Sequence, residues 1–213
     1  VDSIEAILNE DIEAVSLATP TNTHYELAKR LLENKIHVLV EKPIADTVQK
    51  ADELIRLAKE NGVHLVVGHI ERFNPAVLKL KELIEEGQLG KLTSVLARRV
   101  GVFPTRIKDA NVVIDLAVHD IDIISYLLDA APISVQGHSG QAFTSDRDDY
   151  ASLFLDYGNQ SAFIQVNWIT PVKIRKLSVT GTGGYAELNY VDQSLTLYKS
   201  NVSIDNSGGA ESI

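Results

Sequence analysis

The chain has 213 residues, and its 45% hydrophobic and 23% charged content is typical of a folded globular protein. A formal net charge of -9 argues against a nucleic-acid partner, because binding to phosphate backbones requires clustered basic residues. The apolar runs are too short to cross a bilayer, and the absence of cysteine excludes disulfides and thiolate sites. We therefore expect a cytoplasmic protein without membrane or nucleic-acid partners.

The first third of the chain alternates helical and strand patterns. Ser3 begins the first predicted helix as an N-cap, and Gly62 ends the third. The alternation indicates βαβ units around a parallel sheet that helices cover on both faces. In chain order, the predicted elements are a helix over 3–9, a strand over 13–19, a helix over 23–34, a strand over 37–40, a helix over 47–61 and a strand over 63–68.

The pattern changes after Asn74 and Pro75. Strands then dominate, which predicts an open, mainly antiparallel sheet with helices on one face. The fold class is thus α/β plus α+β, with a partial Rossmann domain over 1–73 and an α+β domain over 74–213. The predicted elements are helices over 75–87 and 112–128, strands over 92–100, 133–143, 149–157, 160–169 and 173–180, a hairpin over 185–199, and a polar loop over 200–213.

The sequence "GTGGYA" (181–186) matches the glycine pattern of a dinucleotide-binding loop. That pattern works only between a strand and a helix, where the glycines let a pyrophosphate approach the helix N-terminus. The residues that follow alternate like a strand, so we interpret the segment as a hairpin turn. The parallel portion therefore lacks a glycine-rich first βα unit. Because the chain also begins at Val1 and has no methionine, we expect it to be part of a longer protein.

Lys42 directly follows the predicted strand 37–40. Ligands of open α/β sheets bind beyond the carboxyl ends of the strands, which is where Lys42 lies. Pro43 restricts the backbone of Lys42 to extended angles, and the bond between them is a candidate for the cis form. The alternative is a surface lysine that pairs with a helix residue.

Two further loops occupy equivalent places in the predicted sheet. In "ATPTNTHYE" (18–26), Thr21, Asn22 or Thr23 caps the next helix, or else Asn22 and His24 contact a cofactor. In "GHIERFNP" (68–75), Arg72 either bridges the two domains or holds an anionic group, because its planar fork suits carboxylates and phosphates.

The segment "VVIDLAVHDIDIISYLL" (112–128) carries the most specific signal. At 3.6 residues per turn, Asp115, His119 and Asp122 form one polar stripe on an otherwise apolar helix. His119 is suited to act as a general base, oriented by Asp115, and the alternative is a structurally satisfied histidine. A third convincing ligand is absent, so we predict no metal site.

Taken together, these segments resemble the glucose–fructose oxidoreductase/inositol dehydrogenase (Gfo/Idh/MocA) family. The resemblance covers nearly the whole chain. The matching segments are "ATPTNTHYELA", "VLVEKPIA", "VVGHIERFNP", "DLAVHDID" and, more weakly, "NWITPVKIRKLSVTGTGGYAELN".

This resemblance implies an NAD- or NADP-dependent oxidoreductase that transfers hydride between the nicotinamide and a secondary alcohol of a sugar. It implies that Lys42, Asp115 and His119 are catalytic and that Arg72 lies at the domain junction beside the cofactor. It also implies a dinucleotide site lined by Thr19, Pro20, Asn22, His24, Glu41 and Lys42.

Within the family, the chain looks most like the UDP-N-acetylglucosamine 3-dehydrogenases. That likeness implies a nucleotide-sugar substrate, whose diphosphate would meet basic residues chosen from Arg98, Arg99, Arg106 and Lys108. The alternatives are a polyol or inositol dehydrogenase and a sensor or regulator of the same fold that binds dinucleotide without turnover. The strand residues Phe154, Phe163 and Trp168 predict an apolar sheet face and hence a homodimer or homotetramer. The alternative for Trp168 is a side chain that points to the substrate.

Overall fold

A computed structural model describes residues 3–104, 110–200, 202–204 and 210–212 of the chain. The chain divides into two compact units, Val1–His69 and Ile70–Ile213, compared with an expected boundary near residue 73. Each unit has its own cluster of buried hydrophobic side chains. Among the helices in these residues, none has the length and apolar character needed to cross a membrane.

The first unit is a parallel sheet with three helices. Its strands pair in the order β1-β2-β3, so the predicted βαβ units and the parallel sheet are confirmed. Ser3 accepts a hydrogen bond from the backbone of Ala6, and Gly62 ends α3 with a left-handed backbone, both as expected. The elements are α1 (Ile4–Leu8), β1 (Ala14–Leu17), α2 (Thr21–Glu33), β2 (His37–Val40), α3 (Val48–Asn61) and β3 (Leu65–Val67).

The core of the first unit lies between the sheet and the adjacent helices α2 and α3. Leu31 of α2, Leu54 of α3 and Val38 of β2 are buried there. Successive strand side chains point to opposite faces, and Leu39 and Val66 remain about half exposed on the other face. Within the described residues, the expectation that helices cover both faces is therefore wrong.

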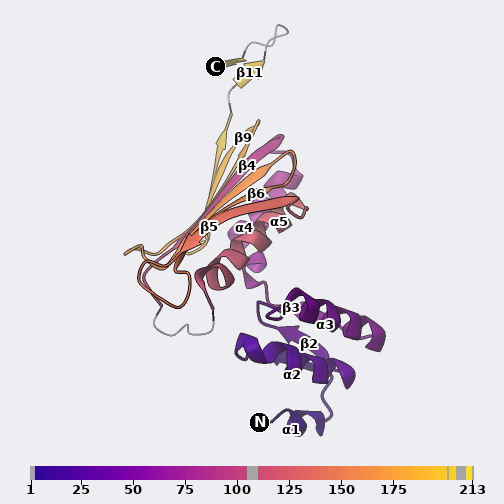
Figure 1. Cartoon of the computed structure of the whole chain (residues 1–213). Coiled ribbons are helices and arrows are strands. Elements are labelled where there is room, and N and C mark those ends of the chain that lie inside the picture. Colours follow the sequence, from indigo (N-terminus) through magenta and orange to yellow (C-terminus); the bar gives the residue numbers. More distant parts are fainter. Residues whose placement is uncertain (1–2, 105–109, 201, 205–209, 213) are drawn as a thin grey trace. The chain divides into compact units, whose positions relative to one another are not determined.

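The second unit is a seven-stranded sheet with helices packed along one face, as Figure 1 shows for α4 and α5. The strand order is β10-β9-β8-β4-β7-β6-β5, and every neighbouring pair is antiparallel except β4 with β7. The predicted open, mainly antiparallel sheet is thus confirmed. Its elements are η1 (Ile70–Phe73), α4 (Pro75–Glu85), β4 (Leu92–Val100), η2 (Val113–Ala117), α5 (Val118–Leu128), β5 (Ser134–Gly140), β6 (Tyr150–Asp156), β7 (Ser161–Asn167), β8 (Ile174–Gly181), β9 (Gly184–Asn189) and β10 (Ser194–Lys199).

The "GTGGYA" segment forms the tight turn between β8 and β9. Gly181 pairs with Gly184 across this turn, which confirms a hairpin rather than a dinucleotide-binding loop. Gly181 also allows a close approach to the chain before β4, since a Cβ atom there would lie 2.2 Å from the carbonyl oxygen of Leu89. These glycines therefore serve backbone packing.

The predicted polar loop over 200–213 contains a further pair of short strands. β11 (Val202–Ile204) pairs antiparallel with β12 (Ala210–Ser212), so the prediction of a loop is wrong for these residues. The β-branched residues Val202 and Ile204 alternate around Ser203, a pattern that favours extended backbone.

A buried ion pair connects α5 to β4. The guanidinium of Arg99 donates to both carboxylate oxygens of Asp120, at 2.9 and 3.0 Å, and to Glu71 at 2.9 Å. Arg99 is 4% exposed and Asp120 is fully buried. Burial lowers the pKa of Arg99, but Asp120 outweighs burial and the net shift is upward. Burial raises the pKa of Asp120, and the guanidinium of Arg99 offsets part of that shift.

A second buried carboxylate shapes the loop between β5 and β6. Asp149 is fully buried, and it accepts the backbone N–H groups of residues 142–144 at distances of 2.7 to 3.1 Å. Burial raises the pKa of Asp149, but these hydrogen bonds outweigh burial and the net shift is downward. The ionised side chain therefore holds the loop in one conformation.

We predict that Asp120→Ala lowers the free energy of unfolding by about 3–5 kcal/mol, because it leaves the guanidinium of Arg99 buried without its main partner. The double variant Arg99→Met/Asp120→Leu should recover most of this loss. Urea unfolding measures both. Glu187→Ala, which removes an exposed pair with Lys176, is the control and should cost less than about 1 kcal/mol. An equal loss in the single and double variants would contradict the assignment.

We predict that Asp149→Asn lowers the free energy of unfolding by about 1–3 kcal/mol at neutral pH. The pKa of Asp149 is lower in the folded than in the unfolded chain, so its contribution is complete above the unfolded pKa and is lost as the pH falls through the folded pKa. The difference between wild type and variant should therefore shrink in acid. Urea unfolding at several pH values checks this, with the exposed Asp146→Asn as the control. A difference independent of pH would be the contrary result.

Candidate functional site

The first unit presents three loops at the carboxyl edge of its parallel sheet. Backbone pairing continues past the strand ends, since Glu41 N–H donates to Leu17 at 3.0 Å and Gly68 N–H donates to Val40 at 2.7 Å. The loops after β1, β2 and β3 therefore begin side by side. This edge is where ligands of open α/β sheets bind.

The loop after β1 carries Thr19 and Pro20, Asn22 follows in the first turn of α2, and all three are exposed. The prediction that Thr21, Asn22 or Thr23 caps α2 is wrong, because α2 begins at Thr21 with Pro20 in the cap position. The hydroxyl of Thr23 instead donates to the carbonyl of Pro20 at 2.7 Å. No side chain caps the first turn at Pro20, and the backbone N–H of Thr23 donates to the carbonyl of Pro20 at 2.9 Å.

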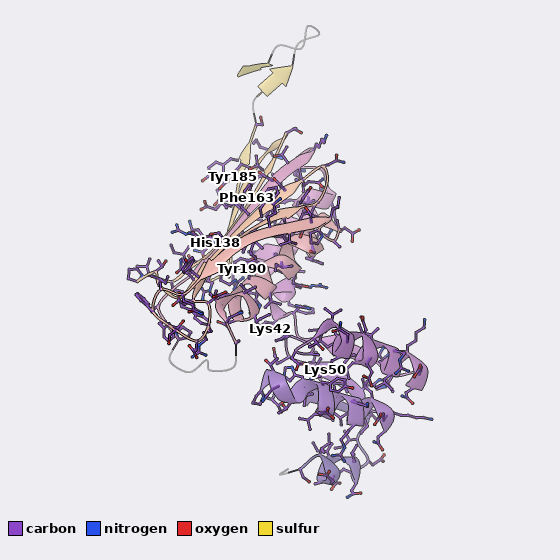
Figure 2. The ribbon with its side chains drawn as sticks, in the orientation of Figure 1. Lys42, Lys50, His138, Phe163, Tyr185 and Tyr190 are labelled. Carbon is purple, nitrogen blue, oxygen red and sulfur yellow. The ribbon has the colours of Figure 1, made fainter. Side chains whose placement is uncertain are left out.

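The loop after β2 carries Glu41 and Lys42, and Figure 2 labels Lys42. Both residues are half-buried, and the bond from Lys42 to Pro43 is cis. The Glu41 carboxylate lies against Gly68, where a Cβ atom would come within 3.3 Å of the carboxyl carbon. Gly68 is not among the predicted site residues, although a glycine directly after a parallel strand is a signal for close backbone or side-chain approach.

His24 lies in the first turns of α2 and is 1% exposed. Its Nδ1 lies 2.8 Å from the carbonyl oxygen of Pro43, and its Nε2 lies 2.8 Å from that of Thr19. The ring thus contacts the loop after β1 and the loop after β2. The structure brings Thr19, His24 and the backbone beside Lys42 together, whereas cofactor contact by His24 stays a prediction.

In the second unit, the predicted regular helix over 112–128 is interrupted. Residues Val113–Ala117 form a π-helical turn, and only Val118–Leu128 is α-helical. The wider turn changes the angular spacing of Asp115 and His119 from the predicted 3.6 residues per turn, and their single polar stripe stays a prediction. Such turns occur frequently at functional sites.

Asp115 has a partner that the sequence analysis missed. The indole N–H of Trp168 donates to its carboxylate at 3.3 Å, and the Trp168 ring meets Phe103 edge to face. Trp168 is 3% exposed, so its predicted place on an exposed sheet face is wrong. It follows β7, where the loop turns back towards the π-helical segment. Its indole instead helps to fix the orientation of Asp115.

Arg72 pairs with a side chain of the same unit. Its guanidinium donates to both carboxylate oxygens of Asp122 and lies over the ring of Tyr126. Asp122, which the sequence placed on the catalytic stripe, therefore orients Arg72. The proposed contact of Arg72 with a cofactor stays a prediction.

Of the four basic residues considered for a diphosphate, Arg98 is exposed on β4. Arg99 is an incorrect candidate, because it is buried and bound to Asp120 and Glu71. Arg106 and Lys108 lie outside the described residues. Within the described part of the chain, no three His, Cys, Asp or Glu side chains are grouped as metal ligands.

The predicted catalytic and cofactor residues are thus divided between the units. Thr19, His24 and Lys42 share one edge of the first, and Asp115 and His119 share consecutive helical segments of the second. The convergence of Lys42 with His119 on one substrate stays a prediction.

The chain is similar to several known oxidoreductases. It is 30% identical over 197 residues to UDP-N-acetylglucosamine 3-dehydrogenase from Acidithiobacillus ferrooxidans, which covers 92% of this chain and 61% of that relative. It is 34% identical over 141 residues to the scyllo-inositol 2-dehydrogenase (NAD(+)) of Bacillus subtilis, covering 64% of this chain and 41% of the relative. The chain therefore spans about three fifths or less of the length of these relatives.

Solved structures show the same architecture. UDP-N-acetylglucosamine 3-dehydrogenase GnnA from Acidithiobacillus ferrooxidans superposes with a TM-score of 0.84 at 28% identity, covering 100% of this chain and 67% of the other. The WlbA dehydrogenase from Bordetella pertussis, in complex with NADH and UDP-GlcNAcA, has a TM-score of 0.85 at 22% identity. The superposition covers 93% of this chain and 62% of the WlbA chain. The second likeness concerns the fold alone.

Two family models match the chain. Residues 1–69 match the model described as "Oxidoreductase family, NAD-binding Rossmann fold". Residues 77–187, more than half of the chain, match the one described as "GFO/IDH/MocA C-terminal domain". The chain therefore belongs to the Gfo/Idh/MocA family of oxidoreductases.

Proposed function

We propose that this chain is part of an NAD(P)-dependent dehydrogenase that oxidises a secondary alcohol of a sugar, with UDP-N-acetylglucosamine as the leading substrate. The observation that carries the proposal is the place of Lys42, half-buried at the carboxyl edge of a parallel sheet beside Glu41 and Thr19. The matching relative from Acidithiobacillus ferrooxidans supports the nucleotide sugar.

The loops of the first unit fit a dinucleotide. Glu41 offers carboxylate oxygens to ribose hydroxyls, and Gly68 leaves room for that carboxylate because any Cβ there would crowd it. Thr19 and Asn22 are exposed and offer a hydroxyl and an amide at the same edge. The first turn of α2 adds backbone N–H donors. We leave NAD and NADP as alternatives, since both carry these groups.

The bound nicotinamide supplies the acceptor for the hydride that leaves the carbinol carbon. In this mechanism, His119 takes the hydroxyl proton as that carbon becomes a carbonyl. The ammonium of Lys42 polarises the same oxygen and stabilises the negative charge that develops on it. Asp115 orients His119 and balances the charge that it gains. Asp115 is in turn held by Trp168.

Two other functions compete with this one. The similarity to scyllo-inositol 2-dehydrogenase supports a polyol as the substrate, with the same chemistry at a carbinol carbon. A sensor that binds dinucleotide without turnover would need the first unit but no base. The combination of Lys42, Asp115 and His119 favours an enzyme over a sensor, because a binding protein gains nothing from a general base.

We predict that the purified protein reduces NAD or NADP when UDP-N-acetylglucosamine is added, with absorbance of the reduced nicotinamide as the measurement. Lys42→Met and His119→Ala should each lower kcat by about a hundredfold or more, because each removes one proton-transfer or charge-stabilising group. Lys50→Met is the matched control, since Lys50 pairs with Asp46 on the surface of α3. Turnover of myo- or scyllo-inositol alone would favour the polyol, and dinucleotide binding without any turnover would favour the sensor.

We also propose that the second unit forms a homodimer or homotetramer through the exposed face of its sheet. Leu96, Phe163 and Phe154 lie opposite one another on β4, β7 and β6. Leu96 is 54% and Phe163 48% exposed, and the rings of Phe154 and Phe163 are 5.0 Å apart. Figure 2 labels Phe163 and Tyr185 on this sheet. A second copy of the chain offers the same apolar row and so covers the face with matching chemistry.

We predict that Phe163→Lys dissociates the oligomer, because it places a charge in the middle of the apolar row. Analytical ultracentrifugation should show a smaller species with unchanged secondary structure. Leu78→Lys is the control, since Leu78 is 47% exposed on α4 and outside the row. A wild-type protein that sediments as a monomer at high concentration would refute the assembly.

A further inference from the structure

The two contacts of His24 have the same chemical character. Nδ1 and Nε2 each lie 2.8 Å from a backbone carbonyl oxygen, that of Pro43 and that of Thr19 respectively. A carbonyl oxygen can only accept a hydrogen bond, so each nitrogen must donate. The ring is 1% exposed, and water therefore has little access to either contact.

A neutral imidazole has one N–H group and one nitrogen lone pair. In that form, one of the two contacts would set a lone pair against a carbonyl oxygen at 2.8 Å in a buried site, which is repulsive. The imidazolium form has two N–H groups and satisfies both carbonyls. The geometry around His24 therefore matches the doubly protonated ring.

His37, in the same unit, shows the opposite arrangement. Its Nδ1 accepts the backbone N–H of His64 at 2.8 Å, so this nitrogen carries a lone pair. His37 lies at the start of β2, at the opposite end of that strand from Lys42. The chain thus offers one histidine that must donate twice and one that must accept, which gives a matched internal comparison.

We propose that His24 is a positioning residue, held as an imidazolium, that fixes the loop after β1 against the loop after β2 and thereby places Lys42. One ring contact is to Thr19 and the other to Pro43, the residue directly after Lys42. The effect on turnover rests on the proposed dehydrogenase function, whereas the protonation of the ring does not.

The charged groups on the elements packed around His24 are few. The loop after β2 carries Glu41 and Lys42, followed by Asp46, whose carboxylate pairs with Lys50 at 2.8 Å. On α2 itself, Glu26 is exposed at the surface. Among these groups, Glu26, Glu41 and Asp46 carry the sign that favours a cation at this edge, and Lys42 carries the opposite one.

The first test reads the protonation of the ring directly. Long-range proton–nitrogen NMR spectra of the 15N-labelled chain are recorded across a pH series, and His24→Gln and His37→Gln assign the signals. At neutral pH, both ring nitrogens of His24 should carry protons, whereas Nδ1 of His37 should not. A single neutral tautomer for His24 in the folded protein at neutral pH would overturn the proposal.

The second test separates positioning from general stability. His24→Phe keeps a buried ring but removes both donors, and it should lower kcat by about a hundredfold, as expected for a misplaced catalytic group, with little change in KM for the sugar. Added to Lys42→Met, it should cost almost nothing more, because it acts through Lys42. Fully additive losses would overturn the proposal.

Conservative variants and a control complete the design. An amide at position 24 has its donor near one ring nitrogen, so His24→Asn should keep the contact to Pro43 and His24→Gln the contact to Thr19. His24→Asn should recover more of kcat than His24→Gln, since only Pro43 adjoins Lys42. Equal rates in the two would count against the proposal. His37→Phe should leave kcat unchanged. If His24 is an imidazolium but the wild-type protein shows no turnover, the proposed dehydrogenase function is refuted. The proposed role of His24 in holding the two loops together is then retained.

Discussion

Parallel pairing of three short strands is the constraint on which the candidate site depends. Because β1, β2 and β3 run in the same direction, their carboxyl ends meet at one edge of the sheet. The backbone pairing extends beyond the strands to Glu41 and Gly68. It therefore fixes the positions at which the loops leave the sheet. Thr19 and Pro43, which are far apart in the sequence, both contact the ring of His24 for this reason. Side-chain chemistry then acts on a scaffold that the backbone has already arranged.

In the second unit, a buried ion pair positions the candidate site residues. Asp120 directly follows His119 in the chain, and its ion pair with Arg99 of β4 connects this helical segment to the sheet. Two buried ions are a costly way to join a helix to a strand, and hydrophobic residues would often serve stability as well. Their directional hydrogen bonds instead fix the rotation of α5 about its axis. A rotated helix would move His119, whereas an apolar contact would tolerate some rotation.

Much of this architecture could be predicted from periodicity. Apolar runs and helical spacing located the elements of both units, and the strand-like alternation after the glycines distinguished the hairpin at Gly181 from a phosphate-binding loop. Three features could not be found in this way. The π-helical turn around Asp115 inserts a backbone irregularity that residue types do not encode. The pairing of Arg99 with Asp120 and that of Trp168 with Asp115 depend on strand register, which a single sequence leaves open.

Trp168 has a consequence of its own, because it is the single tryptophan of the chain. All indole emission of this chain therefore comes from one buried ring whose N–H contacts the carboxylate of Asp115. Excited indole is sensitive to the electric field and to hydration, both of which change when a ligand reaches that carboxylate. The protein thus contains a built-in optical reporter at the centre of its second unit, and intrinsic fluorescence can follow occupancy there without any label.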